Sequence, residues 1–369
     1  MKRPHLLLTT DVVGGVWDFC CTLAGALVAD HDWRITLLAL GEPTADQVAY
    51  AEAITADLLS APLKLEWMHN AEAHIDRTRA LITNLVAKLE PDLVHANQFA
   101  AACLHADVPV LLTVHSDVLS WRRWTLGTNE VPAEWLGYVE LVQSGLRCAD
   151  AVVAVSRFLA REVRCLYGSR RPIEVIYNGW ARPAIEPVRP KQPLTLLAGR
   201  AWDAAKNIVL AAEAAHGWDP GRVYLAGDQR HPDSGGSLDV PPPIQPLGQL
   251  PRAELDQWLA RASIFVSPAR YDPFGLLPLQ AALAGCALLL SDIPSYRELW
   301  DGAALFFRSD DPADLRRQWS LLLSEPSLVQ ELSSVARGCA LERYSVDRMV
   351  DAYVSLYAEL SEHAVKVPA

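Results

Sequence analysis

Residues 271–280, Tyr-Asp-Pro-Phe-Gly-Leu-Leu-Pro-Leu-Gln, combine acid, glycine and amide groups in a pattern that suits binding of an anion or a sugar hydroxyl. The apolar run before them, 262–268, is typical of a buried strand, and Gly275 lies where this strand gives way to a helix. The first backbone N–H groups of a helix have no partner within it, so they can bind such a ligand. Asp272 and Gln280 lie eight positions apart, one before the helix and one on it. A structural strand–turn–helix unit with an incidental glycine explains the segment equally well.

Two cations flank the carboxyl end of another predicted strand, residues 194–198. Gly199 and Arg200 follow this strand directly, and Lys206 and Asn207 stand at the start of the next predicted helix. A guanidinium fork and an ammonium group beside free backbone amides suit a diphosphate. The alternative is a surface loop with ordinary solvated charges.

The first half of the chain offers two further candidates. Gly14 and Gly15 lie between a predicted strand and a helix, where glycine permits close backbone approach, although a tight turn explains them as well. Their spacing is not the G-x-G-x-x-G of a dinucleotide site. His115 stands at the carboxyl end of the predicted strand 110–114 and is either a cleft residue or a structural one.

Composition limits the classes of protein to which this chain can belong. The chain has 369 residues, which favours two domains, and its net charge of -11 disfavours nucleic acid as the main partner. No apolar run approaches the length of a membrane span, so we expect no transmembrane segment, and a peripheral membrane contact stays open. Seven scattered cysteines without a C-x-x-C pair predict reduced thiols and a cytoplasmic location. The histidines have no metal-binding spacing, so we expect no metal site.

Short apolar runs alternate with helical patterns along the whole chain, which is the rhythm of a parallel sheet covered by helices. The predicted strands are residues 6–9, 35–40, 93–95, 110–114, 151–155, 174–177, 194–198, 222–226, 264–267, 287–291 and 305–307. Long helical patterns cover residues 71–89, 312–337 and 346–362. A proline-rich stretch, 183–193, is predicted to be a linker. We therefore expect one domain over 1–182 and a second over 194–345.

An ordered set of motifs runs through nearly the whole chain. It comprises Gly14-Gly15, His115, residues 151–156, Asn178-Gly179, Gly199-Arg200, Lys206-Asn207, Gly227-Asp228, Gly248 and residues 271–280. In its order and spacing the set resembles the GT-B-fold glycosyltransferases of family 4, which retain anomeric configuration. The resemblance implies two Rossmann-like doubly wound domains facing a central cleft, with a C-terminal helix, about 346–369, that crosses back to complete the first domain.

The resemblance also implies the reaction. A sugar would pass from a nucleotide diphosphate sugar to a hydroxyl of a saccharide, a lipid-linked glycan or a small molecule, as in polysaccharide biosynthesis. UDP-glucose is mildly preferred over GDP-mannose as the donor. The nucleotide sugar is a co-substrate, and neither a metal nor another cofactor is implied.

Site residues follow from the same resemblance. Arg200 and Lys206 would hold the donor diphosphate, Gly15 would approach it from the first domain, and His115 would lie near the reacting centre. The implied catalytic residues are His115, Asp272, Arg200 and Lys206. The implied donor-binding residues are Gly14, Gly15, Gly199, Arg200, Lys206, Asn207, Phe274, Gly275, Leu276, Leu277 and Gln280.

The chain departs from the family at its E-x7-E pair, where it has Asp272 and Gln280. A neutral amide in place of a carboxylate weakens a hydrogen bond to ribose by about 1 kcal/mol. An acid that is one methylene shorter loses about 1 Å of reach, which can cost on the order of a hundredfold in rate. The alternative function is therefore a catalytically impaired relative that binds a nucleotide sugar or a protein partner.

The acceptor is expected to meet the first domain. Residues 121–124, Trp-Arg-Arg-Trp, begin a predicted loop that runs to about Trp135, and aromatic and arginine side chains suit sugar faces and acidic groups. A partly buried aromatic loop with solvated arginines is the equal alternative. Residues 64–67, Lys-Leu-Glu-Trp, are a weaker candidate for the same wall.

Overall fold

The computed structural model describes residues 3–104, 106–181 and 190–366. The chain forms two compact units. The first comprises Met1–Ser120, Thr128–Gly179 and Val346–Ala369, and the second comprises Trp121–Gly127 and Trp180–Ser345. The end of the chain therefore returns to the first unit, and helix α4 (Val118–Leu126) is divided between the two.

The first unit is built on a seven-stranded parallel sheet with the strand order β3-β2-β1-β4-β5-β6-β7. Its strands are β1 (His5–Asp11), β2 (Arg34–Leu40), β3 (Asp57–Ala61), β4 (Leu93–Ala96), β5 (Val110–Val114), β6 (Ala151–Ala154) and β7 (Glu174–Val175). Leu6, Leu7 and Leu8 are fully buried and pair in register with β2 and β4. The strand order reverses between β1 and β4, and ligands of such sheets bind beyond the carboxyl ends of the strands at this point.

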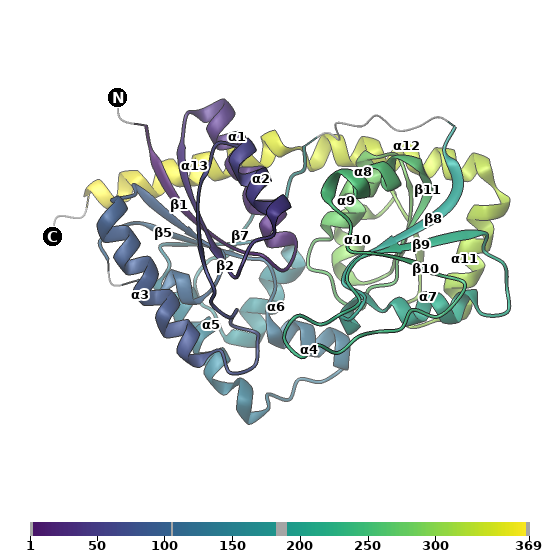
Figure 1. The fold of residues 1–369 in the computed structure, drawn as a ribbon, viewed down its shortest axis with the longest axis horizontal. Helices are drawn as coiled ribbons and strands as arrows, with labels where there is room; N and C mark the ends of the chain where they lie inside the picture. The colour runs from purple at the N-terminus through teal and green to yellow at the C-terminus, as the bar shows by residue number, and fades with distance from the viewer. Residues whose placement is uncertain (1–2, 105, 182–189, 367–369) are drawn as a thin grey trace. The chain divides into compact units, whose positions relative to one another are not determined.

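Helices cover both faces of this sheet (Figure 1). They are α1 (Gly15–His31), α2 (Ala45–Ala53), α3 (Glu72–Leu89), α5 (Leu136–Cys148), α6 (Arg157–Tyr167) and α13 (Val346–Lys366), with the 3-10 turns η1 (Ala100–Ala102) and η2 (Ala133–Trp135). Right-handed crossovers place α1 and α2 on one face and α3, α5 and α6 on the other. The final helix α13 shares the core of the α1 face, since Met349 and Tyr353 pack in one cluster with Trp17.

A buried polar chain also ties α13 to the sheet. The ring nitrogens of His95 lie 2.7 Å from the hydroxyl groups of Tyr357 and Thr113. Thr113 Oγ1 lies 3.1 Å from the hydroxyl of Tyr353. Each buried polar group has a partner, so this part of the core is held in one arrangement.

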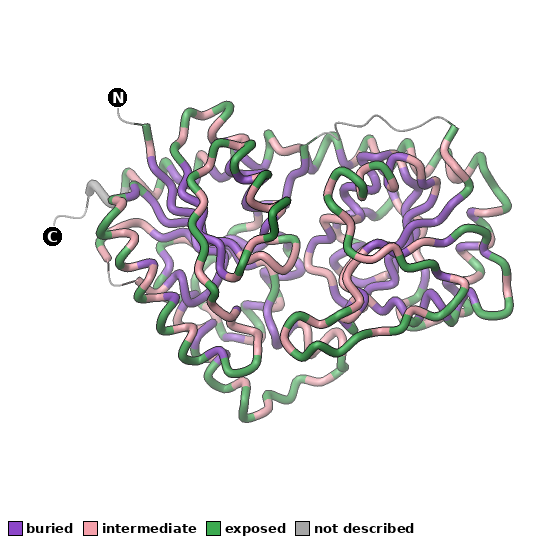
Figure 2. Tube along the Cα trace, in the orientation of Figure 1, coloured by how far each residue is buried: buried purple, intermediate pink, exposed green. Residues whose placement is uncertain are grey.

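The second unit is built on a six-stranded parallel sheet with the order β10-β9-β8-β11-β12-β13. Its strands are β8 (Gln192–Ala198), β9 (Arg222–Ala226), β10 (Gln245–Gly248), β11 (Ala262–Ser267), β12 (Ala287–Ser291) and β13 (Leu305–Phe307). Its helices are α7 (Ile208–Ala215), α8 (Arg252–Arg261), α9 (Leu276–Leu283), α10 (Pro294–Trp300), α11 (Pro312–Ser324) and α12 (Pro326–Arg343), with the 3-10 turn η3 (Ala204–Lys206). Figure 2 shows that the strands form the buried centre of each unit. Here the strand order reverses between β8 and β11.

The predicted α/β class with two doubly wound parallel sheets is confirmed. The helix predicted over 312–337 is wrong in one respect, because α11 ends at Ser324 and α12 begins at Pro326. A proline nitrogen cannot continue the helical hydrogen bonds, and its ring restricts the residue before it. Strands β3 and β10 were not predicted. Residues 183–189 of the predicted linker lie outside the described residues, and Pro193 belongs to β8. Among the described residues, no helix is long and apolar enough to cross a membrane.

Candidate functional site

Two glycines bring the carboxyl ends of β8 and β9 together. The Gly199 N–H donates to the Ala226 carbonyl at 2.9 Å. Gly199 and Gly227 have φ values of 141° and 145°, a region that side chains disfavour. A Cβ atom on Gly227 would lie 1.8 Å from the Gly199 carbonyl oxygen. Only glycine fits at position 227, and this contact sets the course of the loop that carries Arg200.

Asp203 organises the loop between β8 and α7. Its carboxylate accepts from the Ala205 N–H at 3.0 Å and pairs with the Arg200 guanidinium at 2.9 Å. Trp121 of α4 donates its indole N–H to the same carboxylate at 3.0 Å. Burial alone would raise the pKa of Asp203, but Arg200, Lys206 and these donors together hold it below its ordinary value. Asp203 is thus an ionised anchor that orients both predicted phosphate-binding cations.

Lys206 forms an ion pair with Asp272. The Nζ–Oδ2 distance is 2.8 Å, and the two side chains are only 18% and 15% exposed. Tyr296 of α10 donates its hydroxyl to the same Oδ2 at 3.0 Å, and Ser267 lies 2.8 Å from that hydroxyl. The structure therefore brings together two of the predicted site residues and adds that Asp272 is the counter-ion of Lys206.

Asn207 lets the chain turn from η3 into α7. It has a φ of 52°, in the left-handed region that asparagine tolerates better than most residues. Its amide donates to Asp310 at 3.1 Å, and Arg270 pairs with the same carboxylate at 2.7 Å. The side chain therefore fixes the loop, and Asn207 contributes by holding Lys206 in position.

Helix α9 begins at the glycine that the sequence singles out. Gly275 is its N-cap, with a φ of 82°, and a Cβ atom there would lie 2.9 Å from the Tyr296 ring. Leu276 and Leu277 form the first turn, whose N–H groups have no acceptor within the helix. Phe274 is buried before the helix, and Gln280 is buried on it with 5% exposure.

In the first unit, His115 follows β5 and is held by Asn97, which follows β4. Asn97 donates its amide to the Thr9 carbonyl at 2.7 Å, so its oxygen faces His115 Nε2, also at 2.7 Å. The oxygen can only accept, and His115 therefore carries its proton on Nε2. Burial lowers the pKa of His115 to about 3, so the ring is neutral at physiological pH. Its Nδ1 is then a hydrogen-bond acceptor.

Gly14 and Gly15 open the helix that packs against this histidine. Gly14 is the N-cap of α1 in an extended conformation, and Gly15 is the first residue of the helix. Asp11 accepts from the Val13 N–H at 2.9 Å and so forms the turn before them. The ring of Phe19, one turn into α1, lies 4.6 Å from the His115 ring.

One prediction about the acceptor wall is wrong. Residues 121–124 do not begin a loop but lie on helix α4. Asp117 accepts from the backbone N–H and the hydroxyl of Ser120. The hydroxyl groups of Tyr138 and Tyr167 accept from the N–H groups of Val118 and Leu119, respectively. These partners satisfy the start of a helix that the sequence window alone does not indicate.

Sequence reasoning also missed three residues that position the predicted ones. Asp203 lies three positions after Arg200, which is a recognisable ion-pair spacing in a helical turn. Asn97 directly follows a strand beside the strand of His115, so both belong to the same sheet edge. Tyr296 has no such signal, because it reaches Asp272 from a helix beyond the next strand.

Two family models match the chain in succession. "Glycosyltransferase Family 4" matches residues 13–180, and "Glycosyl transferases group 1" matches residues 192–325. α-Maltose-1-phosphate synthase of Mycobacterium tuberculosis is 24% identical, over 87% of this chain and 95% of its own length. Glycogen synthase of the same species is 28% identical, over 67% of this chain and 64% of its own length.

Solved structures of similar fold span nearly the whole chain. Sucrose-phosphate synthase of Thermosynechococcus elongatus has a TM-score of 0.79 at 17% identity and covers 98% of this chain and 100% of its own. Anabaena Alr3699/HepE in complex with UDP-glucose has a TM-score of 0.76 at 17% identity and covers 97% and 100%. The chain therefore belongs to the family 4 glycosyltransferases and has the GT-B fold.

Proposed function

We propose that this glycosyltransferase moves a sugar from a nucleotide diphosphate sugar to a hydroxyl group, with retention of anomeric configuration and without a metal. The observation that carries the proposal is the cluster of Arg200, Lys206 and the start of α9. These groups follow β8 and β11, the two strands between which the strand order reverses. Cationic side chains and first-turn N–H groups that have no acceptor within their helix are what a diphosphate requires.

UDP-glucose is the preferred donor in this proposal, with GDP-mannose as the second candidate. The support is the UDP-glucose bound to the Anabaena protein of the same fold and the two glucan-related enzymes among the relatives. These relatives also favour a role in polysaccharide biosynthesis. The described cysteines are free thiols, which fits a reducing compartment such as the cytoplasm.

Each residue has a defined role in the proposal. Arg200 would form a forked contact with the diphosphate, and Lys206 would supply a point charge. The N–H groups of the segment Phe274, Gly275, Leu276 and Leu277 would bind phosphate or sugar hydroxyls, and Gln280 would bind ribose. Gly199 and Asn207 would set the loop, while Gly14, Gly15 and His115 would act from the first unit.

The chemistry needs no carboxylate base. The bond from the anomeric carbon to the phosphate oxygen breaks, and preorganised cations stabilise the charge that grows on the leaving group. The acceptor hydroxyl attacks the same face and passes its proton to the leaving phosphate oxygen. Neutral His115 cannot donate a proton from Nδ1, so its role is to accept a hydrogen bond from a sugar hydroxyl.

A second function is favoured by a specific observation. Asp272 pairs with Lys206 in the structure, and Gln280 is uncharged, so neither supplies the free carboxylate of the family motif. Such a chain can bind a nucleotide sugar, or a protein partner, without efficient transfer. Binding and turnover must therefore be measured separately.

The first experiment is thermal stabilisation by UDP, GDP and ADP with a chelator present. A ligand at a hundred times its dissociation constant adds about 2.7 kcal/mol to the free energy of unfolding. Arg200→Ala should weaken nucleotide binding by about tenfold or more, because a charge-assisted contact is lost. Arg222→Ala is the matched control, since Arg222 is exposed at the opposite end of the same sheet.

The outcomes separate the two functions. A preference for one nucleotide that Arg200→Ala weakens, followed by detectable sugar transfer from the matching donor, supports the enzyme. The same binding without transfer to any hydroxyl acceptor supports the impaired protein. No stabilisation by any nucleotide at millimolar concentration would refute the donor site itself.

A further inference from the structure

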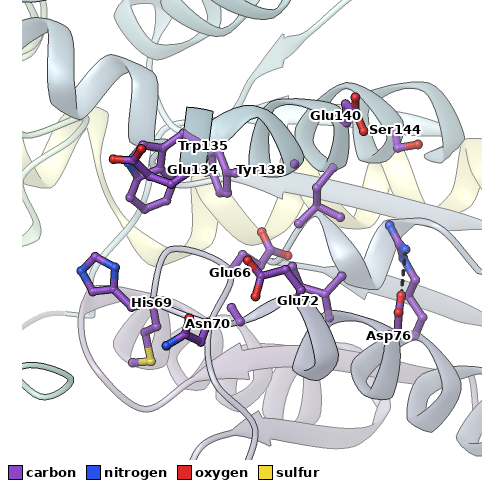
Figure 3. Close-up of a pocket in the computed structure, with 16 residues that line it drawn as sticks. Glu66, His69, Asn70, Glu72, Asp76, Glu134, Trp135, Tyr138, Glu140 and Ser144 are labelled. Atoms are coloured by element: carbon purple, nitrogen blue, oxygen red, sulfur yellow. Dashed lines mark hydrogen bonds and ion pairs between the residues drawn. The ribbon is translucent and has the colours of Figure 1, made fainter. Parts of the chain in front are cut away.

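The first unit contains a cavity of about 430 Å³ that none of the predicted donor-binding residues lines. One wall is the segment from Glu66 to Ala71 and the first two turns of α3, and the other is η2 with the start of α5. Figure 3 shows the two walls facing each other, with Glu66 and Glu72 near the middle of the space between them. Its volume lies within the usual range for small-molecule sites.

Acidic groups dominate the lining. Five carboxyl groups face one guanidinium group and one histidine: Glu66, Glu72, Asp76, Glu134 and Glu140 against Arg79 and His69. The guanidinium is itself paired with Asp76 at 3.4 Å. A phosphate or carboxylate ligand would meet like charge from most directions, so the lining disfavours an anion.

Two aromatic side chains form the end of the cavity beside Glu134 (Figure 3). Trp135 is partly exposed, and its ring meets the buried Tyr138 ring edge to face at 5.7 Å. The Tyr138 hydroxyl accepts from the Val118 N–H at 3.3 Å, which ties this wall to the segment that follows His115. A rigid ring face with carboxylates beside it offers both an apolar surface and hydrogen-bond acceptors, as sugar-binding sites require.

Two further polar groups, on Glu66 and Arg79, belong to the lining of the cavity. Glu66 Oε1 accepts from the Ala100 N–H at 2.6 Å, which fixes the direction of its carboxyl group. Arg79 Nε is buried and has no hydrogen-bond acceptor within the part of the chain that the structure describes. That nitrogen is enclosed by protein atoms, so a ligand in the cavity would meet the exposed part of the Arg79 side chain, which is 34% exposed.

We propose that this cavity is a binding site for an uncharged saccharide, with a glycosyl ring against Trp135 and its hydroxyl groups on the surrounding carboxylates. The hydroxyl groups of a sugar can donate to the carboxylates and accept from Arg79. One neutral ligand therefore supplies partners for both kinds of group in the lining. A phosphorylated sugar is repelled by the acidic rim. The lining thus selects neutral saccharides over phosphorylated ones. Binding at this site can be measured directly, without any transfer activity.

The experiment is isothermal titration of the full chain with maltotriose as the neutral probe and glucose 1-phosphate as the charged probe. We expect the neutral saccharide to bind and glucose 1-phosphate to bind more weakly, because the acidic lining repels its phosphate group. Trp135→Ala should weaken maltotriose binding by about tenfold or more, because the stacking surface is lost. Leu136→Ala should stay within about twofold of the original chain, since this neighbouring residue is 54% exposed and does not line the cavity.

A second variant tests the charge argument without altering the ring. Glu134 is exposed at the rim, so Glu134→Lys is expected to fold normally, to keep maltotriose binding and to bind glucose 1-phosphate more tightly. The proposal is overturned by absence of maltotriose binding at millimolar concentration, by unchanged binding in Trp135→Ala, or by stronger binding of glucose 1-phosphate to the original chain. Thermal stabilisation by nucleotides, measured on the same variants, should be unchanged, which separates failure of this site from failure of the donor site.

Discussion

Replacing Glu66 by glutamine should stabilise the protein at alkaline pH and have little effect at acidic pH. Burial raises the pKa of Glu66 from an ordinary value of 4.5 to about 7, although the backbone donors at Ala100 and Phe99 and the charge of Arg79 oppose this. Between these two pH values the folded protein keeps a proton that the unfolded chain releases. Its stability therefore falls as the pH rises through this window, and the loss is complete above pH 7.

The magnitude follows from the two pKa values. A change from 4.5 to about 7 corresponds to about 3 kcal/mol of unfolding free energy. Glutamine has no charge to desolvate and keeps an oxygen that can accept from the Ala100 N–H, the contact that Glu66 makes at 2.6 Å. Glu66→Gln should thus gain up to about 3 kcal/mol at pH 8.5 and less than about 1 kcal/mol at pH 5.

Urea unfolding of both proteins at pH 5 and pH 8.5 measures this gain, because other titrating groups cancel in the difference between them. Glu72→Gln is the matched control: it lies on the same cavity wall but is exposed, and it should change stability by less than about 0.5 kcal/mol at either pH. An equal gain at both pH values would refute the reasoning, because it would not depend on ionisation. A loss at pH 8.5 would mean that the carboxylate itself stabilises the fold.

Two further predictions concern the second unit. Gly302→Ala adds a side chain at a φ of 76° in open space and should lower the free energy of unfolding by about 1 kcal/mol. Gly275→Ala also brings Cβ to 2.9 Å from Tyr296, so it should cost about 1–3 kcal/mol more when both are measured by urea unfolding. Equal costs would show that the close contact with the ring is unimportant. Lys206→Ala should destabilise the protein by about 2 kcal/mol, because it leaves the little-exposed Asp272 carboxylate unpaired, and adding Asp272→Asn should recover part of the loss. Additive losses in this double-mutant cycle would contradict the ion pair.

The grouping of Arg200, Lys206 and the start of α9 could be predicted because it depends on local chain order. Arg200 and Lys206 follow a strand that is recognisable from its apolar residues, and Gly275 precedes a helix whose start the sequence marks. In a parallel sheet the carboxyl ends of strands meet at one edge, so strand assignment alone brings these residues near one another. The alternation of strands and helices likewise predicted both parallel sheets, apart from their edge strands β3 and β10.

The start of α4 could not be predicted in the same way, because its partners come from distant segments. Tyr167 accepts from the Leu119 N–H across 48 positions of sequence, and Trp121 reaches Asp203 across 82. A short stretch of sequence reveals local helix propensity but not contacts with distant residues. The aromatic and basic segment 121–124 was therefore assigned to a loop. A local signal did exist, since Asp117 stands three positions before Ser120, as an N-cap residue does.

Asp272 illustrates what family comparison leaves out. Judged from the family motif alone, Asp272 is an acid one methylene shorter than the usual glutamate, with reduced reach toward a sugar. In the structure its Oδ2 already has two partners, Lys206 and Tyr296, at 2.8 and 3.0 Å. A little-exposed ammonium group requires a counter-ion, and Arg200 meets the same requirement through Asp203. Each cation predicted to bind phosphate is therefore neutralised by a carboxylate of the protein. A diphosphate must compete with these carboxylates, so the affinity of the site depends on the strength of its internal ion pairs as well as on the number of its cations.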